Sequence, residues 1–275
     1  MTLGETLRTT AEHLERAGVD SPRLDAERIV AHALRLTRLD LYTEQDRPLT
    51  DDEAASVERL VGRRAAREPL AYVLGAWGFR HLTLRTDARA LAPRPETEIL
   101  VERALELLDR IEAPRVLEVG VGTGAVALSL ALERPGARVT GTDVSSEALA
   151  LARENADALG LEIELVHAPL LAGLAGPFDL VVSNPPYVRA EELASLEPEV
   201  RDWEPREALL DEGQTEAIAR DARRVLAAHG ALALEVHELH ARAVATFLAE
   251  LGYHGVAVTR DLAGRDRVVE ARWTP

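Results

Sequence analysis

Apolar residues recur at helical spacing through the first part of the chain, and helix-start signals precede the runs. Thr2 with Glu5, and again Thr50 with Glu53, form the pattern of a capping box, in which the two side chains satisfy backbone groups at a helix N-terminus. Each pair is followed by an apolar stripe that a helix would bury in a core. Residues 1–73 therefore predict a small helical bundle that forms a domain of its own.

After this bundle the pattern changes twice. Glycines and alternating apolar positions over 74–95 predict a β-hairpin that links two domains. Beyond it, the expected strands are 115–119, 138–142, 163–166, 178–183 and 231–236, with others near 256 and 268, and the expected helices are 99–108, 125–132, 146–159, 217–226 and 239–251. This alternation predicts an α/β domain over 96–275, whose mostly parallel sheet carries helices on both faces.

Composition is that of a globular protein. Apolar residues make up 47% of the chain and charged residues 29%, which is enough apolar surface for a sizeable core. The first residues lack the basic and apolar regions of a secretory signal, and no run approaches the roughly 20 apolar residues of a membrane span, so we expect a cytoplasmic protein. The absence of cysteine excludes disulfides, thiol nucleophiles and thiolate metal sites.

The charge balance bears on the substrate. The chain has 47 acidic and 32 basic residues, a formal net charge of −15. Proteins that bind a nucleic-acid backbone usually gather Lys and Arg against the phosphates, so this balance favours a protein or small-molecule substrate. A local basic patch is still compatible with it. The acidic run 191–199 is most simply interpreted as a solvated loop.

The first strand of the α/β domain runs into a glycine-rich turn, Gly120-Val121-Gly122-Thr123-Gly124, and Glu118 stands two positions before it. Glycines let the backbone turn tightly and approach a ligand, and the helix expected next offers free N–H groups. The following strand ends at Asp143, about 20 residues on, where doubly wound folds bind ribose hydroxyls. Together these features favour a nucleoside site. The simpler alternatives are a tight turn and, for Asp143, a helix cap.

The segment Asn184-Pro185-Pro186-Tyr187 follows the expected strand 178–183 and is the most specific signal in the chain. At the carboxyl end of a strand it should face the same crevice as the glycine turn. The Asn184 side-chain oxygen and the rigidly held Pro185 carbonyl can accept both hydrogens of an –NH₂ group and orient its nitrogen toward an incoming methyl. Tyr187 can stack on a flat amide or base. We therefore expect methyl transfer to a planar amide or amine nitrogen, a Pro-Pro turn without a ligand being the alternative.

Beyond these single motifs, nearly the whole chain resembles a known family. The glycine turn fits neither the dinucleotide fingerprint nor a P-loop, and it is similar to the first motif of Rossmann-like S-adenosylmethionine methyltransferases. The chain, helical front included, resembles the HemK/PrmC protein-glutamine N5-methyltransferases. The resemblance is carried by the Asn184 segment together with 72–75, 93–98, 199–206 and 261–267. It implies a Rossmann-like methyltransferase sheet with an N-terminal helical domain and a β-hairpin linker.

The resemblance also implies an activity. That family methylates the glutamine of the Gly-Gly-Gln motif in bacterial class I peptide chain release factors. By resemblance, Gly120 to Gly124 bind the methionine end of the S-adenosylmethionine cofactor and Asp143 binds its ribose, with Leu170 and Asn184 also at the cofactor. Asn184, Pro185, Pro186 and Tyr187 bind the glutamine amide, and the helical domain helps to recognise the release factor. Family members commonly carry an acidic residue beside the adenine, but this chain has Pro169-Leu170 there, so no carboxylate contact to the adenine is expected.

The expected mechanism is in-line transfer from the sulfonium to an oriented amide nitrogen, with Asn184, Pro185 and Tyr187 as catalytic residues and no evident general base. The main alternative is a DNA or RNA methyltransferase acting on the adenine N6 or guanine N2 amino group, because that class uses a similar motif. The acidic balance and the lack of a basic tail count against it. A scaffold that binds cofactor without catalysis is a further alternative, although Asn184 and the glycine turn are both intact.

The residues before the first helix of the α/β domain and two histidines near the chain's end give weaker signals. Arg94 and Glu96 either line the crevice or anchor the hairpin, and the sequence favours neither. His237 and His240 lack a third ligand nearby, so we expect no metal. We also expect a monomer with no nucleic-acid or membrane partner.

Overall fold

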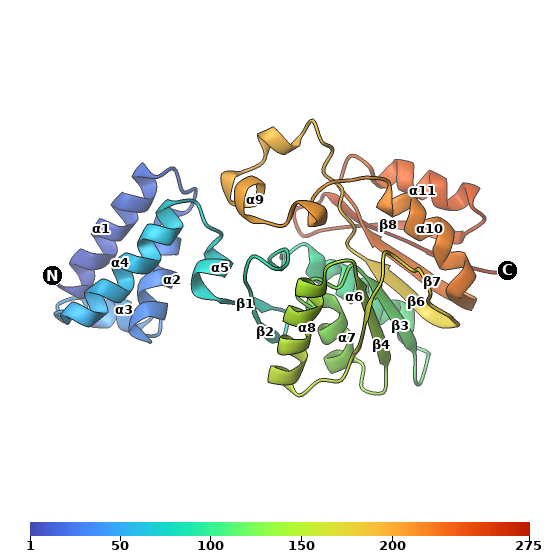
Figure 1. The fold of residues 1–275 in the computed structure, drawn as a ribbon, viewed down its shortest axis with the longest axis horizontal. Coiled ribbons are helices and arrows are strands. Elements are labelled where there is room, and N and C mark those ends of the chain that lie inside the picture. Colours follow the sequence, from blue (N-terminus) through green and yellow to red (C-terminus); the bar gives the residue numbers. More distant parts are fainter. The chain divides into compact units, whose positions relative to one another are not determined.

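A computed structural model describes residues 1–275, and contacts divide the chain into two compact units. The helical unit comprises Met1–Ala76 and Glu197–Trp203, and the sheet unit comprises Trp77–Leu196 and Glu204–Pro275 (Figure 1). This division differs from the expected one chiefly because a short segment far along the chain belongs with the N-terminal helices.

The helical unit is built from short helices around one apolar core. Its helices are α1 (Leu3–Arg16), α2 (Pro22–Leu34), α3 (Asp40–Thr43), α4 (Asp51–Ala65), α5 (Leu70–Leu74) and α9 (Pro198–Trp203). Both capping boxes form: the hydroxyls of Thr2 and Thr50 accept hydrogen bonds from the N–H groups of Glu5 and Glu53, whose carboxylates accept from the threonine N–H groups. The core gathers Leu3, Leu14, Ile29, Val30, Leu41, Val57 and Leu60. The predicted helical bundle is therefore confirmed.

Glu199 holds the second segment of the helical unit in place. Its carboxylate accepts hydrogen bonds from Arg64 at 2.7 Å and from Arg67 at 2.6 and 2.7 Å, while Arg64 also donates to the buried Asp25 at 2.7 Å. Burial works against the charged form of Glu199, but hydrogen bonds from Arg67 and Arg64 outweigh it and keep its pKa below the ordinary value. The interpretation of 191–199 as a solvated loop is therefore wrong at Glu199, which is paired and largely covered.

The sheet unit contains a seven-stranded sheet. Its strands are β3 (Arg115–Val119), β4 (Arg138–Asp143), β5 (Glu164–His167), β6 (Phe178–Ser183), β7 (Leu226–Glu235), β8 (His254–Arg260) and β9 (Asp266–Arg272), in the order β5-β4-β3-β6-β7-β9-β8. The first five are parallel, and β9 runs antiparallel to both of its neighbours. Strand β7 begins at Leu226 rather than at residue 231, because Leu226 already pairs with Phe178. The predicted mostly parallel sheet is confirmed.

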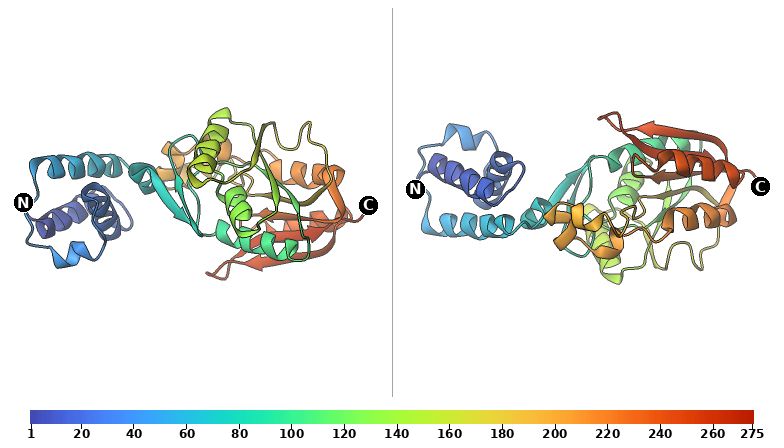
Figure 2. Two further views of the ribbon diagram at one scale, coloured as in Figure 1. Left: turned by 90° about the horizontal axis from the view of Figure 1, so that it is seen from below. Right: turned by 90° about the horizontal axis from the view of Figure 1, so that it is seen from above.

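Helices cover both faces of this sheet (Figure 1, Figure 2). One face packs against α6 (Thr97–Leu108), α7 (Ala125–Glu133) and α8 (Ser146–Leu159), and the other against α10 (Gln214–Val225) and α11 (Ala241–Glu250). Successive residues of a strand point to opposite faces, so Val116 belongs to the first of these cores and Leu117 to the second. None of the helices is long and apolar enough to cross a lipid bilayer.

A two-stranded hairpin and two short turns complete the elements. The hairpin is formed by β1 (Ala76–Phe79) and β2 (Leu82–Arg85), and the 3-10 turns are η1 (Leu193–Ser195) and η2 (Arg206–Ala208). Phe79, Leu82 and Leu84 of the hairpin are buried in the core that contains α6, α7 and α8. Strands thus occupy only the first part of the expected linker, and its remainder is a loop that leads into α6.

We expect Arg64→Met to lower the free energy of unfolding by about 3–5 kcal/mol, because it leaves the buried carboxylate of Asp25 without its ion pair and Glu199 with Arg67 alone. Arg8→Met is the matched control, since Arg8 and Glu12 form an exposed pair of a kind that contributes at most about 1 kcal/mol. Urea unfolding of both full-length variants, followed by circular dichroism and tryptophan fluorescence, measures the difference. Equal, small losses would contradict a stabilising role for Arg64.

Candidate active site

The carboxyl ends of β3, β4 and β6 open into a cavity of about 690 Å³ within the sheet unit. The strand order reverses here, because the chain continues from β3 to β4 and β5 on one side and returns to β6 and β7 on the other. Ligands of doubly wound sheets bind at such a point. The lining comes from the loop before α6, the turn after β3, the end of β4, the segment after β5, the turn after β6 and the loop before α10.

The glycine turn after β3 has a left-handed backbone at three positions. Gly120, Gly122 and Gly124 have φ angles of 77°, 53° and 85°, a region in which other residues are strained. The N–H groups of the first two residues of the turn both donate to the Thr142 carbonyl at 2.8 Å, which fixes the turn against β4. The turn up to Thr123 and the first residues of α7 line the cavity, so free N–H groups of the α7 N-terminus lie at its wall.

Asp143 joins the glycine turn to the end of β4. One carboxylate oxygen accepts from the Gly122 N–H at 2.9 Å and the other from the Ser145 N–H at 2.9 Å. The helix-cap alternative for Asp143 is wrong, because Ser145 is the N-cap of α8 and its hydroxyl accepts from the Ala148 N–H. Asp143 lines the cavity, and each of its oxygens retains a lone pair for a ligand hydroxyl.

Glu118 precedes the same turn and contacts the helix that follows it. Its carboxyl group is buried and accepts a hydrogen bond at 2.7 Å from the N–H of Ala127 in the first turn of α7. Burial raises the pKa of Glu118 well above its ordinary value, and the nearby charge of Asp143 acts in the same direction. The sequence indicated Glu118 only as part of the glycine pattern, without this contact to the helix.

The wall after β5 is apolar. Ala168, Pro169 and Leu170 line the cavity, and the carbonyl of Leu170 accepts a hydrogen bond from the Thr142 hydroxyl at 3.0 Å. Leu170 itself has a positive φ of 51°, which turns the chain at this wall. The side chains of Ala168, Pro169 and Leu170 carry no carboxylate, so the surface that they give this wall is apolar.

The turn after β6 reaches the same cavity. Asn184, Pro185 and Pro186 line it, and the Asn184 Nδ2 atom donates to the hydroxyl of Thr97 at 3.3 Å, which leaves the Oδ1 atom as the side chain's acceptor. Tyr187 is not among the lining residues. Its ring centroid lies 6.0 Å from that of His237, and burial raises the pKa of its phenol. The structure thus brings the asparagine and the prolines to the glycine turn but places the tyrosine to one side.

Arg94 lines the cavity and also holds the loop before α6. Its guanidinium pairs with the buried carboxyl of Glu204, which in addition accepts from the Ala92 N–H at 3.3 Å. Burial raises the pKa of Glu204, and the positive charge of Arg94 opposes that rise. Glu96 is not part of the lining, so the two alternatives separate: Arg94 faces the cavity and Glu96 does not.

Other residues at the site had no role predicted from the sequence. Thr97 opens α6, and the loop 205–212 forms the wall before α10. Glu235, at the end of β7, is buried beside this region. A threonine at a helix start and a glutamate at a strand end are common, and only the resemblance over 93–98 and 199–206 directed attention to part of this set.

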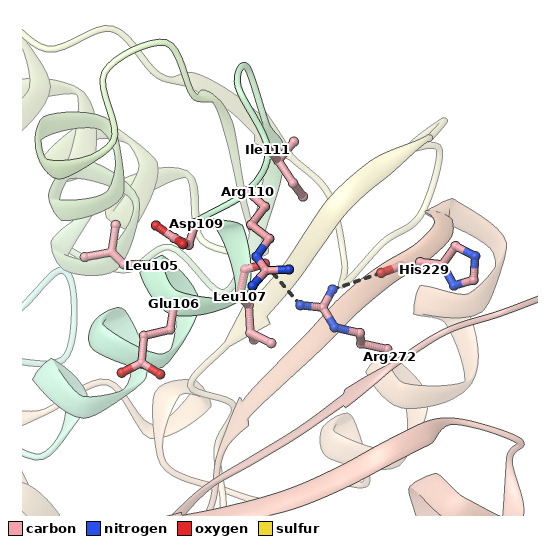
Figure 3. A pocket seen from close by; sticks show the side chains of 8 residues that line it. All are labelled: Leu105, Glu106, Leu107, Asp109, Arg110, Ile111, His229 and Arg272. Atoms are coloured by element: carbon pink, nitrogen blue, oxygen red, sulfur yellow. Dashed lines mark hydrogen bonds between the residues drawn. The ribbon is translucent and has the colours of Figure 1, made fainter.

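A second hollow, of about 800 Å³, lies at the opposite edge of the sheet, where β7 begins and β9 ends. Figure 3 shows the guanidinium of Arg272 there, directed to the backbone carbonyls of His229 and Leu107 at 3.1 and 3.3 Å. Because these donors already have backbone partners, we assign no chemistry to this hollow. The rings of His237 and His240 lie 5.5 Å apart elsewhere, and no group of three potential metal ligands forms in the chain.

Comparison with solved structures places the fold. The ribosomal protein L11 methylase of Lactobacillus delbrueckii subsp. bulgaricus is 22% identical and covers 67% of this chain and 81% of its own, with a TM-score of 0.50. A methyltransferase of Pyrococcus furiosus is 19% identical and covers 71% of this chain and 90% of its own, with a TM-score of 0.52. The sheet, with its glycine turn and cavity, is that of a Rossmann-like S-adenosylmethionine-dependent methyltransferase.

Sequence comparison defines the family. Residues 5–75 match the PrmC N-terminal domain and residues 96–198 the methyltransferase small domain. A release factor glutamine methyltransferase of Deinococcus radiodurans is 44% identical over 99% of both chains, and one of Chlorobaculum tepidum is 41% identical over 96% of this chain and 94% of its own. The chain belongs to the release factor glutamine methyltransferase family, and the resemblance drawn from its motifs is confirmed.

We expect Asp143→Ala to raise the Kd for S-adenosylmethionine by about 10- to 100-fold, because a hydrogen bond to a charged group contributes roughly 1.5–3 kcal/mol. Asp157→Ala is the control, since Asp157 is an exposed carboxylate on α8. Isothermal titration calorimetry with each variant measures the two constants. An unchanged Kd for the Asp143 variant would remove this residue from the cofactor site.

Proposed function

We propose that the protein transfers the methyl group of S-adenosylmethionine to N5, the side-chain amide nitrogen, of the glutamine in the Gly-Gly-Gln motif of bacterial class I peptide chain release factors. The relatives are release factor glutamine methyltransferases, which supports this substrate class. The observation that carries the proposal is that Asn184 and Pro185 line the same cavity as the glycine turn. The choice of glutamine within the release factor rests on the resemblance of the motif segments.

The cavity fits the cofactor. Its volume lies within the range of small-molecule sites, roughly 300–1,000 Å³. The glycine turn and the first turn of α7 offer backbone donors to the methionine end, and Asp143 offers acceptors to the ribose hydroxyls. Leu170 and its neighbours provide an apolar wall for the adenine. When bound, S-adenosylmethionine supplies an electrophilic methyl group on a sulfonium sulfur.

Asn184 and Pro185 orient the acceptor. The Oδ1 atom of Asn184 and the carbonyl of Pro185 accept the two amide hydrogens of the glutamine, which directs the nitrogen toward the methyl group. A carboxamide nitrogen is a poor nucleophile because its lone pair is delocalised, so fixed acceptors and alignment supply most of the rate. The N–C bond forms as the C–S bond breaks, and the nitrogen then releases one hydrogen to water as a proton. Tyr187 lies next to His237 and is not among the residues that line the cavity, so we give it no contact with the glutamine.

The remaining parts of the proposal concern the partner. The net charge of −15 supports a protein acceptor over a nucleic acid. The helical unit contributes to recognition of the release factor, the enzyme acts as a monomer, and it works in the cytoplasm, where release factors meet ribosomes.

The substrate is tested by incubating the protein with methyl-labelled S-adenosylmethionine and, in separate reactions, a class I release factor, the same factor with its Gly-Gly-Gln glutamine replaced by Ala, DNA, and ribosomal RNA. We expect label only in the unmodified release factor, with one methyl group on the glutamine amide by mass spectrometry. Equal label in the alanine form would overturn the glutamine assignment. Label confined to DNA or RNA would favour a base methyltransferase instead.

We expect Asn184→Ala to lower kcat by about 100-fold or more, because the amide nitrogen loses one of the two acceptors that align it. The Kd for S-adenosylmethionine should stay within about twofold, since the glycine turn and Asp143 are untouched. Thr246→Ala is the control, because Thr246 lies on the surface of α11 and its hydroxyl bonds only within that helix. Wild-type turnover by the Asn184 variant would refute the orienting role.

A further inference from the structure

Glu235 is a buried carboxyl group that the proposed mechanism does not use. It ends β7, and only 1% of the residue is exposed. Ser183 of β6 pairs with Leu234 of β7, so the next two residues, Asn184 and Glu235, leave adjacent parallel strands side by side. The Oε2 atom of Glu235 has no hydrogen-bond partner. A carboxyl group buried in this way is costly, and such exceptions in a folded protein are associated with function.

Thr97 connects Glu235 to the acceptor side chain. Its hydroxyl accepts a hydrogen bond from the Asn184 Nδ2 atom at 3.3 Å. Hydrogen bonding by the same hydroxyl is among the influences that lower the pKa of the Glu235 carboxyl group, against the rise that burial causes. A hydroxyl has one proton, so a hydroxyl that donates to a carboxylate is left with lone pairs to accept from an amide. The hydrogen bonds then have one direction: the Asn184 amide donates to the Thr97 hydroxyl, and that hydroxyl donates to the Glu235 carboxylate. We call these three side chains the relay.

This direction decides which atom Asn184 presents to the substrate. With Nδ2 held by Thr97, the Oδ1 atom faces away from the relay as an acceptor. If the amide turned over, Nδ2 would face the –NH₂ group of the substrate, where two donors repel each other and the alignment of the nitrogen is lost. The sequence position of Asn184 alone does not set this choice, because the two ends of its amide have nearly the same shape.

We propose that Thr97 and Glu235 are positioning residues, which together lock the amide of Asn184 with its oxygen toward the methyl acceptor. This inference rests on the proposed function, because it assigns Asn184 the role of accepting a hydrogen from the substrate amide. Thr97 lines the cavity and Glu235 does not, and both act here through the side chain of Asn184.

The relay is sensitive to protonation of Glu235. Burial raises the pKa of this carboxyl group to about 7, while the Thr97 hydrogen bond and the charges of Arg267 and Arg94 lower it and that of Glu96 raises it. Tyr187 also faces the group, but its phenol stays neutral in this range because burial raises its pKa from 10. Above pH 7 the carboxylate accepts a hydrogen bond from Thr97, and the Asn184 amide keeps its orientation. Below pH 7 the carboxyl group gains a proton, so Thr97 no longer has an obligatory acceptor and the orientation of the Asn184 amide is less restricted.

A direct test needs no substrate. The chain has two asparagines, Asn155 and Asn184, so protein labelled with ¹⁵N-asparagine gives two side-chain amide signals. We expect the Asn184 signal to titrate with a midpoint near pH 7 in wild type and to lose that titration in Glu235→Gln. Asn155 is the internal reference, because its Nδ2 atom donates to backbone carbonyls. An Asn184 signal that is independent of pH, or that titrates equally in Glu235→Gln, overturns the relay.

A kinetic test uses Thr97. We expect Thr97→Val, which keeps the shape and removes the hydroxyl, to lower kcat at least about tenfold while the Kd for S-adenosylmethionine stays within about twofold. Thr97→Ser, which restores the hydroxyl, should return kcat to within about threefold of wild type. The acidic limb of the wild-type pH profile, with a midpoint near 7, should be absent in Glu235→Gln. Wild-type kcat in a folded Thr97→Val protein overturns the proposal.

The two proposals fail in different ways. If wild type does not methylate a release factor, the proposed function fails, yet the Asn184 titration still reports on the relay. If wild type is active but the Asn184 signal does not respond to Glu235, the relay alone fails. Should Thr97→Val not fold, the ¹⁵N titration of wild type and Glu235→Gln decides the matter without it.

Discussion

Parallel pairing of β3 with both β4 and β6 is the constraint on which the site depends. Strands that run in the same direction end at the same edge of the sheet. Because the strand order reverses at this point, a crevice forms between the turns that follow these strands. The glycine turn, Asp143 and Asn184 each follow one of these three strands. The sheet therefore brings these three groups close together, and the loops only adjust their positions around the cavity.

Rigidity at this edge comes from backbone bonds and buried side chains. The Thr142 carbonyl accepts from two N–H groups of the glycine turn, and the Ser183 hydroxyl ties β6 to the Val119 carbonyl at 2.6 Å. Asp143 and Glu118 add a carboxyl group on each side of the turn. A methyl transfer that depends on alignment requires such a frame, because small displacements of the acceptor are costly in rate.

Features encoded by neighbouring residues could be predicted from the sequence, and features created by distant contacts could not. The capping boxes at Thr2 and Thr50, the apolar runs of the strands and the glycine turn all depend on spacing within a few residues. The early start of β7 depends on pairing with β6, which no local pattern indicates. The contact of Thr97 with Asn184 joins two parts of the chain that only the fold brings together, so neither residue predicts the other. The position of Tyr187 likewise depends on packing against His237.

The path of the chain limits how this protein can exchange parts with its relatives. Residues 197–203 stand in the sequence between two segments of the sheet unit, yet they belong to the helical unit. There the carboxylate of Glu199 pairs with Arg64 and Arg67. A helical unit taken from a distant relative would have to supply equivalent arginines, or Glu199 would be left as an unpaired, partly buried charge. The N-terminal helices therefore cannot be exchanged independently of residues 197–203. Recombination that separates residues 1–76 from residues 197–203 should be selected against.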